Sequence, residues 1–187
     1  MHYKLETYIN DARNFQKHGQ YDFAIDFLLK AKNLDHKHKY EAEIEKLLSF
    51  NHRKLREFEQ ALIHINNAIH INSKEANDIS KKEYAICLMN KGIIFEELKQ
   101  ENKVLECYLP ALKIFINLFD SDSNNYGLII NTLITIGMFY YKQENYSIAR
   151  EYFEKSLPYF ESNRDSDRRY ITITNILKTI KEKFGLS

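Results

Sequence analysis

Apolar residues recur at spacings of three and four along most of this chain. Such spacing places them on one face of an α-helix, whereas a half-buried strand would need apolar and polar residues in strict alternation. No stretch of strand length shows that alternation. Glycine and proline, which tight turns between strands use, number only five and two. The pattern therefore predicts an all-α protein.

The helical pattern contains a repeat with a fixed internal spacing. Each unit begins with an apolar residue. A small residue stands four positions later, and an aromatic ring stands three positions after the small residue. The triplets are Tyr8, Ala12 and Phe15; Leu88, Gly92 and Phe95; Leu133, Gly137 and Tyr140; and a degraded version, Glu45, Ser49 and His52. A second pattern begins 12 residues after each small residue, at Ala24, Ala61, Val104 and Ala149. The constant spacing indicates four copies of one structural unit.

Each unit is best explained as a hairpin of two helices. Spacings of four, three and seven put the repeated side chains on one face of each helix. The small residues then lie where the two helices approach closely, and the large residues fill the space around them. We expect hairpins at about residues 3–36, 38–73, 80–119 and 125–161.

The C-terminal tail predicts one more helix, at about residues 166–184. Gly185 is a plausible stop for this helix. An end repeat exposes an apolar face, so a final helix with one polar side is the expected cap. Its apolar stripe consists of Tyr170, Ile173, Leu177, Ile180 and Phe184.

These units resemble tetratricopeptide repeats (TPRs). The residues that carry the resemblance are Tyr8, Ala12, Phe15, Gly19, Tyr21, Ala24, Leu28 and Ala31 in the first unit, and Leu133, Gly137, Tyr140, Tyr146, Ala149, Phe153 and Ser156 in the last. The resemblance implies a single TPR-like α-solenoid domain over residues 1–187. Its concave side would be lined by the first helix of each unit, as in other helical solenoids. It also implies a protein-binding or peptide-binding module.

The spacing between units departs from the usual TPR length. Equivalent positions are 37, 43 and 45 residues apart, against about 34 in a typical TPR. Longer units and concave asparagines, here Asn90 and Asn131, are similar to those of bacterial peptide-pheromone receptors of the RRNPP type. Many of those receptors carry an N-terminal DNA-binding domain, for which the first hairpin leaves no room. The chain is therefore either a fragment or not such a regulator.

A second TPR comparison is less favourable. Some TPR proteins hold the C-terminal carboxylate of a partner with a lysine and an asparagine of the first unit. The corresponding positions here are Ile9 and Arg13. Only Asn90 resembles a later residue of such a clamp, which disfavours this mode of binding.

Composition and charge narrow the function classes. The net charge of +1 arises from 27 basic and 26 acidic residues, which disfavours a dedicated nucleic-acid binder. No apolar run approaches the about 20 residues of a membrane span, and the N-terminus lacks the apolar core of a signal peptide. Cys87 and Cys107 fall within helical apolar patterns, as expected for reduced, buried thiols. We expect a cytoplasmic protein.

The sequence offers little for catalysis or metal binding. The five glycines never cluster, so no phosphate-binding loop exists. Asp120, Asp122 and Asn124 begin like a calcium loop, but Asn125 and Asn131 replace its required glycine and glutamate. The remaining candidates, His36 with His38 and Glu96 with Glu97, lack the partners of a metal site or of an opposed carboxylate pair. We expect no enzyme activity, no cofactor and no metal.

The remaining candidate site is the concave face. Polar or aromatic side chains that lie off the packing stripe are candidates for peptide contacts, and asparagine amides both donate and accept hydrogen bonds. Tyr141 is the ring left outside the packing stripe. The candidates are Arg13, Gln16, Arg53, Asn90, Asn131, Thr135 and Tyr141.

Ordinary solvated residues are the alternative interpretation of each of these side chains. The expected partner is a peptide or protein segment. Two alternatives stay open for the whole chain: a structural assembly subunit, including a homo-oligomer, and the TPR portion of a peptide-responsive bacterial regulator.

Overall fold

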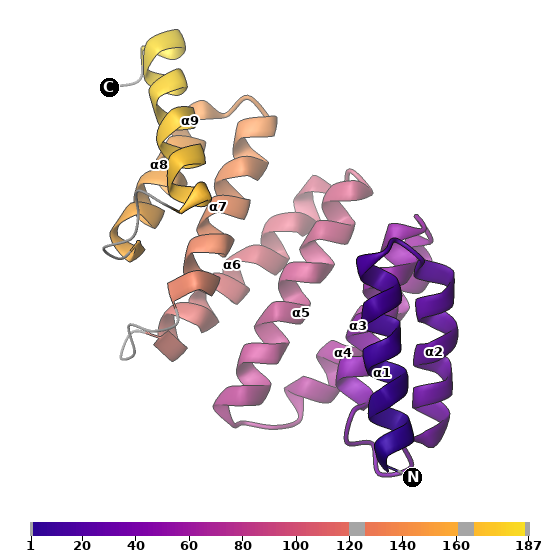
Figure 1. Cartoon of the computed structure of the whole chain (residues 1–187). Coiled ribbons are helices and arrows are strands. Elements are labelled where there is room, and N and C mark those ends of the chain that lie inside the picture. Colours follow the sequence, from indigo (N-terminus) through magenta and orange to yellow (C-terminus); the bar gives the residue numbers. More distant parts are fainter. Residues whose placement is uncertain (1, 120–125, 161–166, 186–187) are drawn as a thin grey trace. The chain divides into compact units, whose positions relative to one another are not determined.

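The computed structural model describes residues 2–119, 126–160 and 167–185, and the regular secondary structure in these ranges is helical (Figure 1). The helices are α1 (His2–Lys17), α2 (Tyr21–Leu34), α3 (Glu41–Lys54), α4 (Phe58–Ser73), α5 (Asp78–Glu97), α6 (Glu101–Phe119), α7 (Tyr126–Lys142), α8 (Tyr146–Ser156), a short 3-10 helix η2 (Leu157–Tyr159) and α9 (Arg168–Phe184). The all-α prediction is confirmed. None of the described helices is both long and apolar enough to cross a membrane.

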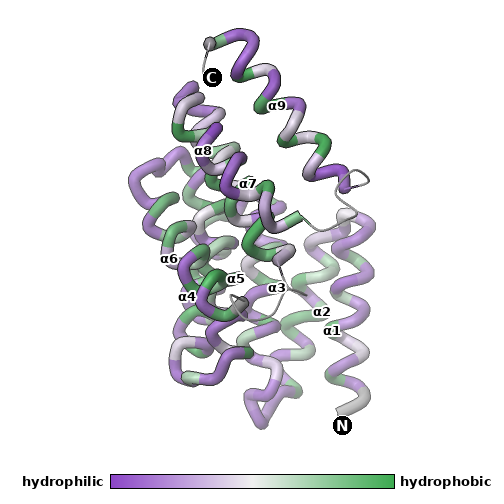
Figure 2. Tube along the Cα trace, turned by 90° about the vertical axis from the view of Figure 1, so that its left-hand side faces the viewer, coloured by the Kyte–Doolittle hydropathy of each residue, from purple (hydrophilic) through white to green (hydrophobic). Residues whose placement is uncertain are grey.

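The helices pair as the repeat predicts. Helix α1 packs against α2, α3 against α4, and α7 against α8. Along these helices hydrophobic and hydrophilic segments follow one another within each turn or two (Figure 2). Each helix therefore has an apolar side that its neighbours bury and a polar side.

The chain forms two compact units, Met1–Cys107 and Tyr108–Ser187. We call them the N-terminal and C-terminal units. The boundary falls within α6, whose helical assignment continues through Pro110. The expectation of a single domain over residues 1–187 stays a prediction.

The turn of every hairpin contains one residue in the left-handed backbone conformation. These residues are Gly19 (φ 72°), Arg56 (φ 64°), Lys99 (φ 57°) and Glu144 (φ 60°). Each lies seven residues after the small residue of its first helix and five before the residue that begins the second pattern. Side chains with a Cβ adopt this conformation at a cost, and glycine does not.

Hydrogen bonds complete the same turn in all four hairpins. The amide after each left-handed residue donates to the carbonyl five positions earlier, as in the Schellman motif that ends many helices. The donor–acceptor pairs are Gln20 to Phe15 at 2.9 Å, Glu57 to His52 at 2.9 Å, Gln100 to Phe95 at 2.9 Å and Asn145 to Tyr140 at 3.0 Å. The carbonyl that accepts this hydrogen bond at the end of the first helix therefore belongs to the third residue of each repeated triplet.

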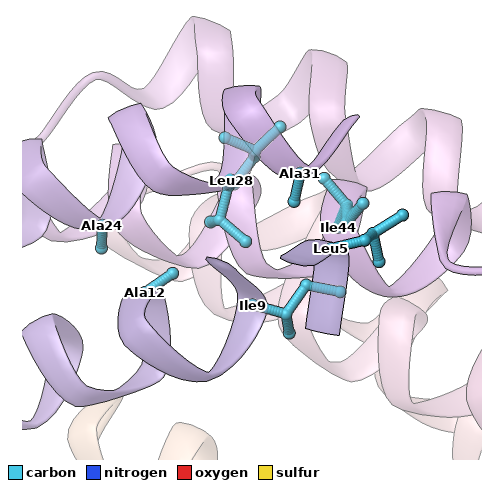
Figure 3. Close-up of a cluster of buried hydrophobic side chains, with 8 residues drawn as sticks. Leu5, Ile9, Ala12, Ala24, Leu28, Ala31 and Ile44 are labelled. Atoms are coloured by element: carbon cyan, nitrogen blue, oxygen red, sulfur yellow. The ribbon is translucent and has the colours of Figure 1, made fainter. Parts of the chain in front are cut away.

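Small residues allow the helices of a hairpin to approach closely. In the first hairpin Ala12 of α1 faces Ala24 of α2, and Leu28 and Ile9 fill the space beside them (Figure 3). All four side chains are at most 3% exposed. In the last hairpin a Cβ added to Gly137 would lie 2.6 Å from a ring carbon of Phe153, closer than real contacts allow.

The rings of residues 140–160 are packing residues. Phe153 is fully buried, and Tyr140 and Tyr146 pack around it. Tyr140 stacks on Tyr152 with ring centroids 5.8 Å apart. The rings therefore build the interior of the C-terminal unit and form no open cage.

The extra length of the third unit lengthens its helices. Helix α5 has 20 residues and α6 has 19, against 14 in α2 and in α3. Asn77 caps α5, because its side chain accepts a hydrogen bond from the Ser80 amide at 2.8 Å. Residues 120–125, which contain most of the calcium-like stretch, lie outside the described residues.

The predicted C-terminal cap is confirmed. Ile173 and Ile180 of α9 are buried in the cluster that contains Ala149 and Phe153. Asp167 caps the N-terminus of α9, and Gly185 ends the helix in the left-handed conformation with φ 63°. Helix α9 thus covers α8, which would otherwise expose its apolar side.

Replacing Gly137 by alanine tests the close approach of α7 and α8. We expect Gly137→Ala to destabilise the protein by about 1–2 kcal/mol, because overpacking against Phe153 exceeds the gain in helix propensity. Gly127→Ala is the control, since an added Cβ there meets only one side-chain atom, at 4.0 Å. Thermal unfolding followed by circular dichroism measures both. Equal stability of the two variants would contradict the packing.

Candidate functional site

The predicted site residues divide between the two compact units. Arg13, Gln16, Arg53 and Asn90 belong to the N-terminal unit, and Asn131, Thr135 and Tyr141 belong to the C-terminal unit. Each set is therefore described within its own unit.

In the N-terminal unit, ion pairs connect neighbouring first helices. Arg13 of α1 pairs with Glu43 of α3. Lys46 and Arg53 of α3 pair with Glu83 and Glu97 of α5. The predicted residues Arg13 and Arg53 therefore each pair with a carboxylate of the neighbouring first helix.

Three side chains on each helix form a surface that we call the α3–α5 surface. Glu83, Asn90 and Glu97 recur every seven residues and so share one side of α5. Asn90 lies between the two ion-paired glutamates. Its half-buried amide makes no hydrogen bond to any described residue. An amide with unused donors and acceptor between two charged pairs is suited to bind another backbone.

The α3 side of this surface adds an aromatic ring. Phe50 lies between Lys46 and Arg53 on one side of α3, at spacings of four and three. The Phe50 ring is half-buried, and the charged ends of Arg53 and Lys54 each lie 5.5 Å from its centroid. The α3–α5 surface thus combines Lys46, Phe50, Arg53, Glu83, Asn90 and Glu97.

A shallow groove lies between α1 and α3. Ile9 forms an apolar part of its wall, and the Tyr40 hydroxyl donates a hydrogen bond to Glu6. Arg13 is the predicted residue that lines it. The lining consists of Glu6, Ile9, Asn10, Arg13, Tyr40 and Glu43.

Gln16 lies one turn after Arg13 on α1. Its Nε2 atom is buried and has no hydrogen-bond partner among the described residues.

The sequence analysis did not identify Glu43 or Glu97 as site residues, although the repeat contains a signal for Glu43. Glu6 and Glu43 both stand six residues before the small residue of their helix, so alignment of the units marks that position as acidic.

The C-terminal unit places its predicted residues differently. The Asn131 side chain accepts a hydrogen bond from Arg169 of α9, with Nη1 2.9 Å from Oδ1. Thr135 donates its hydroxyl to the Asn131 carbonyl of the same helix at 2.7 Å. Arg169 is itself held by Asp167 at 2.6 Å. The structure therefore joins Asn131 to α9.

The assignment of Tyr141 as a ring outside the packing is wrong. Its ring lies edge-on to Tyr146, with centroids 5.3 Å apart, and packs against the cluster of Phe153 and Ile173. The first helix of this hairpin is covered by α9 as well as α8, which the position in the repeat does not reveal. A role of Tyr141 in binding stays a prediction.

The degraded triplet of the second hairpin builds a buried polar network. Glu45 is 1% exposed. Its carboxylate accepts hydrogen bonds from Lys32 at 2.6 Å and Asn67 at 3.0 Å, and His64 Nδ1 lies 2.8 Å away. The His64 ring stacks on His52 at 5.1 Å. The network joins α2, α3 and α4.

These contacts change the acidity of Glu45. Burial alone raises its pKa, but the hydrogen bonds from His64, Lys32 and Asn67 outweigh burial and lower the pKa from 4.5 to about 2. Because the carboxylate is saturated with donors and enclosed, it stabilises the fold and is not a catalytic base.

The two cysteines of the described chain are buried thiols. Cys87 and Cys107 are free and buried, as predicted. Burial raises the pKa of the Cys87 thiol to about 11, which makes the thiolate scarce. Within the described ranges, no three His, Cys, Asp or Glu side chains come together to hold a metal ion.

Glu45→Gln tests the network through pH. Since the Glu45 pKa is lower in the folded than in the unfolded protein, its stabilisation is complete above pH 4.5 and is lost as pH falls toward 2. We expect the variant to lose about 2–3 kcal/mol of unfolding free energy at neutral pH, and progressively less in acid. Urea unfolding measures this. The control is Glu59→Gln, at an exposed residue. A loss of unfolding free energy in Glu45→Gln that stays the same at every pH would contradict the network.

Comparison with known proteins begins with the sequence. No family model matches the chain. Response regulator aspartate phosphatase I of Bacillus subtilis (strain 168) is 31% identical over 122 residues, which cover 65% of this chain and 28% of that protein. The chain thus spans well under half the length of this curated relative.

Solved structures agree on the fold. Aspartyl phosphate phosphatase F from Bacillus subtilis superposes with a TM-score of 0.78 at 20% identity, over 95% of this chain and 45% of that one. TPR-like repeats of a putative kinesin light chain from Podosopora anserina superpose with a TM-score of 0.73 at 14% identity, over 97% and 87%. The predicted TPR resemblance is confirmed, and the chain has a TPR-like helical repeat fold of the α-solenoid class.

Proposed function

We propose that this chain is a non-catalytic binding module that holds a peptide or an extended protein segment on its first helices. The observation that carries the proposal is the α3–α5 surface. There the unpaired Asn90 amide lies between two interhelical ion pairs, beside the half-buried Phe50 ring.

The chemistry of this surface suits an extended peptide. The Asn90 amide matches a backbone that needs one donor and one acceptor. Phe50 offers an apolar contact for a side chain, and the ion pairs Lys46–Glu83 and Arg53–Glu97 offer charges of both signs at either end. Because ion pairs at a surface contribute little to stability, a ligand with charged side chains can exchange with them at low cost.

The comparisons support a binding role and suggest a class of partner. The curated relative is named for a phosphatase activity and for response regulators. The present chain spans 28% of that relative, and we propose only the binding role for it. A segment of a response regulator is one partner of the proposed kind.

Two alternatives stand beside this proposal, and the first has separate support. The greater length of the Bacillus subtilis phosphatases supports the chain being the TPR portion of a larger peptide-responsive regulator of the RRNPP kind. Assembly through an edge hairpin is the second alternative. In either case we propose a cytoplasmic protein. Its balanced charge of +1 favours no direct contact with nucleic acid.

The proposed surface can be tested with peptides selected from a random display library on the intact protein. We expect Asn90→Ala to weaken a selected peptide by up to about tenfold, because a hydrogen bond between a neutral amide and a peptide backbone contributes about 0.5–1.5 kcal/mol. Fluorescence anisotropy measures the affinity. Asn66→Ala, at an exposed asparagine of α4, is the matched control.

Two results decide between this surface and another. Loss of affinity in Asn90→Ala and in Arg53→Ala, with retention in Asn66→Ala, supports the α3–α5 surface. Unchanged affinity in all three variants, with helicity intact by circular dichroism, would move the ligand to another face and refute the assignment.

A further inference from the structure

The shallow groove between α1 and α3 is a small cavity with a volume of about 230 Å³. Pockets that hold a whole small molecule usually have roughly 300–1,000 Å³. The groove therefore has room for one end of a ligand. We call it the α1–α3 groove, lined by Glu6, Ile9, Asn10, Arg13, Tyr40 and Glu43.

Each carboxylate of the α1–α3 groove uses only one of its oxygens. The Tyr40 hydroxyl donates to Oε1 of Glu6, and Arg13 Nη2 donates to Oε1 of Glu43. The Oε2 atoms of Glu6 and Glu43 accept no hydrogen bond from a described residue. The groove thus presents two carboxylate oxygens that can accept hydrogen bonds from a ligand.

A hydrogen-bond donor lies beside these acceptors. Asn10 stands four residues after Glu6, so the two side chains are neighbours on α1. Its Oδ1 lies 3.4 Å from Arg13 Nη1, whereas its Nδ2 donates to no described residue. The Asn10 side chain is exposed. Its amide nitrogen can therefore donate to a carbonyl of the ligand.

The charges that line the groove favour a cation. Two carboxylates line it against one guanidinium, and Arg13 is already paired with Glu43. The Lys39 ammonium donates to the Tyr40 hydroxyl at 3.1 Å but does not line the groove. A ligand carboxylate would approach two carboxylates. An ammonium would instead meet the unused oxygens of both.

The α-amino group of a peptide fits the groove better than the ammonium of a lysine side chain. An ammonium offers three donors, which the two free carboxylate oxygens can accept. In a peptide the first carbonyl follows the amine directly and can accept from Asn10, whereas a lysine ammonium has no neighbouring acceptor. Ile9 and the Tyr40 ring are the apolar parts of the lining that the first side chain can contact.

We propose that the α1–α3 groove binds the free N-terminal amine of a peptide ligand. This inference rests on the proposed function, because the rest of the peptide would lie on the α3–α5 surface. Glu43 and Phe50 are seven residues apart and share one side of α3, about 10 Å apart along the helix. An extended peptide covers that distance in about three residues. Its N-terminus would lie in the groove and its fourth residue near Phe50.

Acetylation of the peptide N-terminus tests the proposal. Peptides are selected on the intact protein from a library displayed with free N-termini. Each is then synthesised with a free or an acetylated amine and with a dye at its C-terminus. We expect acetylation to weaken binding about tenfold, because it removes the positive charge and two of the three donors. Fluorescence anisotropy measures the affinity of both forms.

Glu6→Gln locates the amine in the groove. This variant keeps the shape of the exposed Glu6 side chain and removes its charge. The weakening caused by acetylation should fall from about tenfold to about threefold in Glu6→Gln, because one of the two acceptors has lost its charge. It should stay about tenfold in Glu59→Gln, at an exposed residue of α4. Circular dichroism checks that both variants fold.

The pH dependence gives an independent readout. A free α-amino group loses its proton near pH about 8. The affinity of the free-amine peptide should therefore fall as the pH rises from about 7 to about 9.5, whereas that of the acetylated peptide should stay constant. A purely structural role of Glu6 would not separate the two peptides in this way.

The possible outcomes separate this inference from the proposed function. Equal affinity of the free and acetylated peptides would overturn the inference, and so would an acetylation effect of the same size in Glu6→Gln as in the parent chain. If such peptides still lose affinity in Asn90→Ala, binding at the α3–α5 surface stands. An acetylation effect without any effect of Asn90→Ala would support the groove and refute that surface. Selection of no peptide at all would refute both.

Discussion

The left-handed residue in each hairpin turn is the constraint on which the rest of the structure depends. It reverses the chain after the ring that closes the first helix, at Gly19, Arg56, Lys99 and Glu144 alike. Because the turn is the same length and shape each time, the second helix always begins at the same distance from the small residue of the first. The close contact of Gly137 with Phe153 and the contact of Ala12 with Ala24 follow from that register.

A fixed turn leaves the facing side chains free to vary. The first hairpin uses the rings of Tyr8, Phe15 and Phe27, whereas the second puts Glu45, His52 and His64 in the same places. The polar version is stable because Glu45 has a donor for its carboxylate on each of α2 and α4. Function in such a fold depends on the outward side chains, since the inward ones are committed to packing.

The sequence predicts well whatever lies within one hairpin. The spacing from Ala12 to Ala24 recurs at Ser49 and Ala61, and it predicts the helices, their small contacts and the packing of Phe153. The cap by α9 is predictable for the same reason, from the stripe that includes Ile173 and Ile180. Periodicity carries this information because each contact joins residues at a constant separation.

Contacts between elements of different hairpins were not predictable. The spacings of 37, 43 and 45 residues differ from one pair of hairpins to the next, so no period marks the partners of Arg13, Arg53 or Asn131. Helical phase puts these three on the exposed side but does not identify Glu43, Glu97 or Arg169 as their partners. The expectation that the Tyr141 ring lies outside the packing was wrong for the same reason, because α9 adds a covering surface from outside the repeat.

The shared turn is tested most directly by opposite substitutions at equivalent positions. Gly19→Ala forces a Cβ into the left-handed conformation in open space, and should lower the unfolding free energy by about 1 kcal/mol. Glu144→Gly relieves the same strain and should raise stability by up to about 1 kcal/mol, less the entropy that glycine gains when unfolded. Thermal unfolding of both variants beside the parent chain gives the result. Shifts of opposite sign are predicted, and a loss of stability in Glu144→Gly as large as that in Gly19→Ala would contradict a common turn.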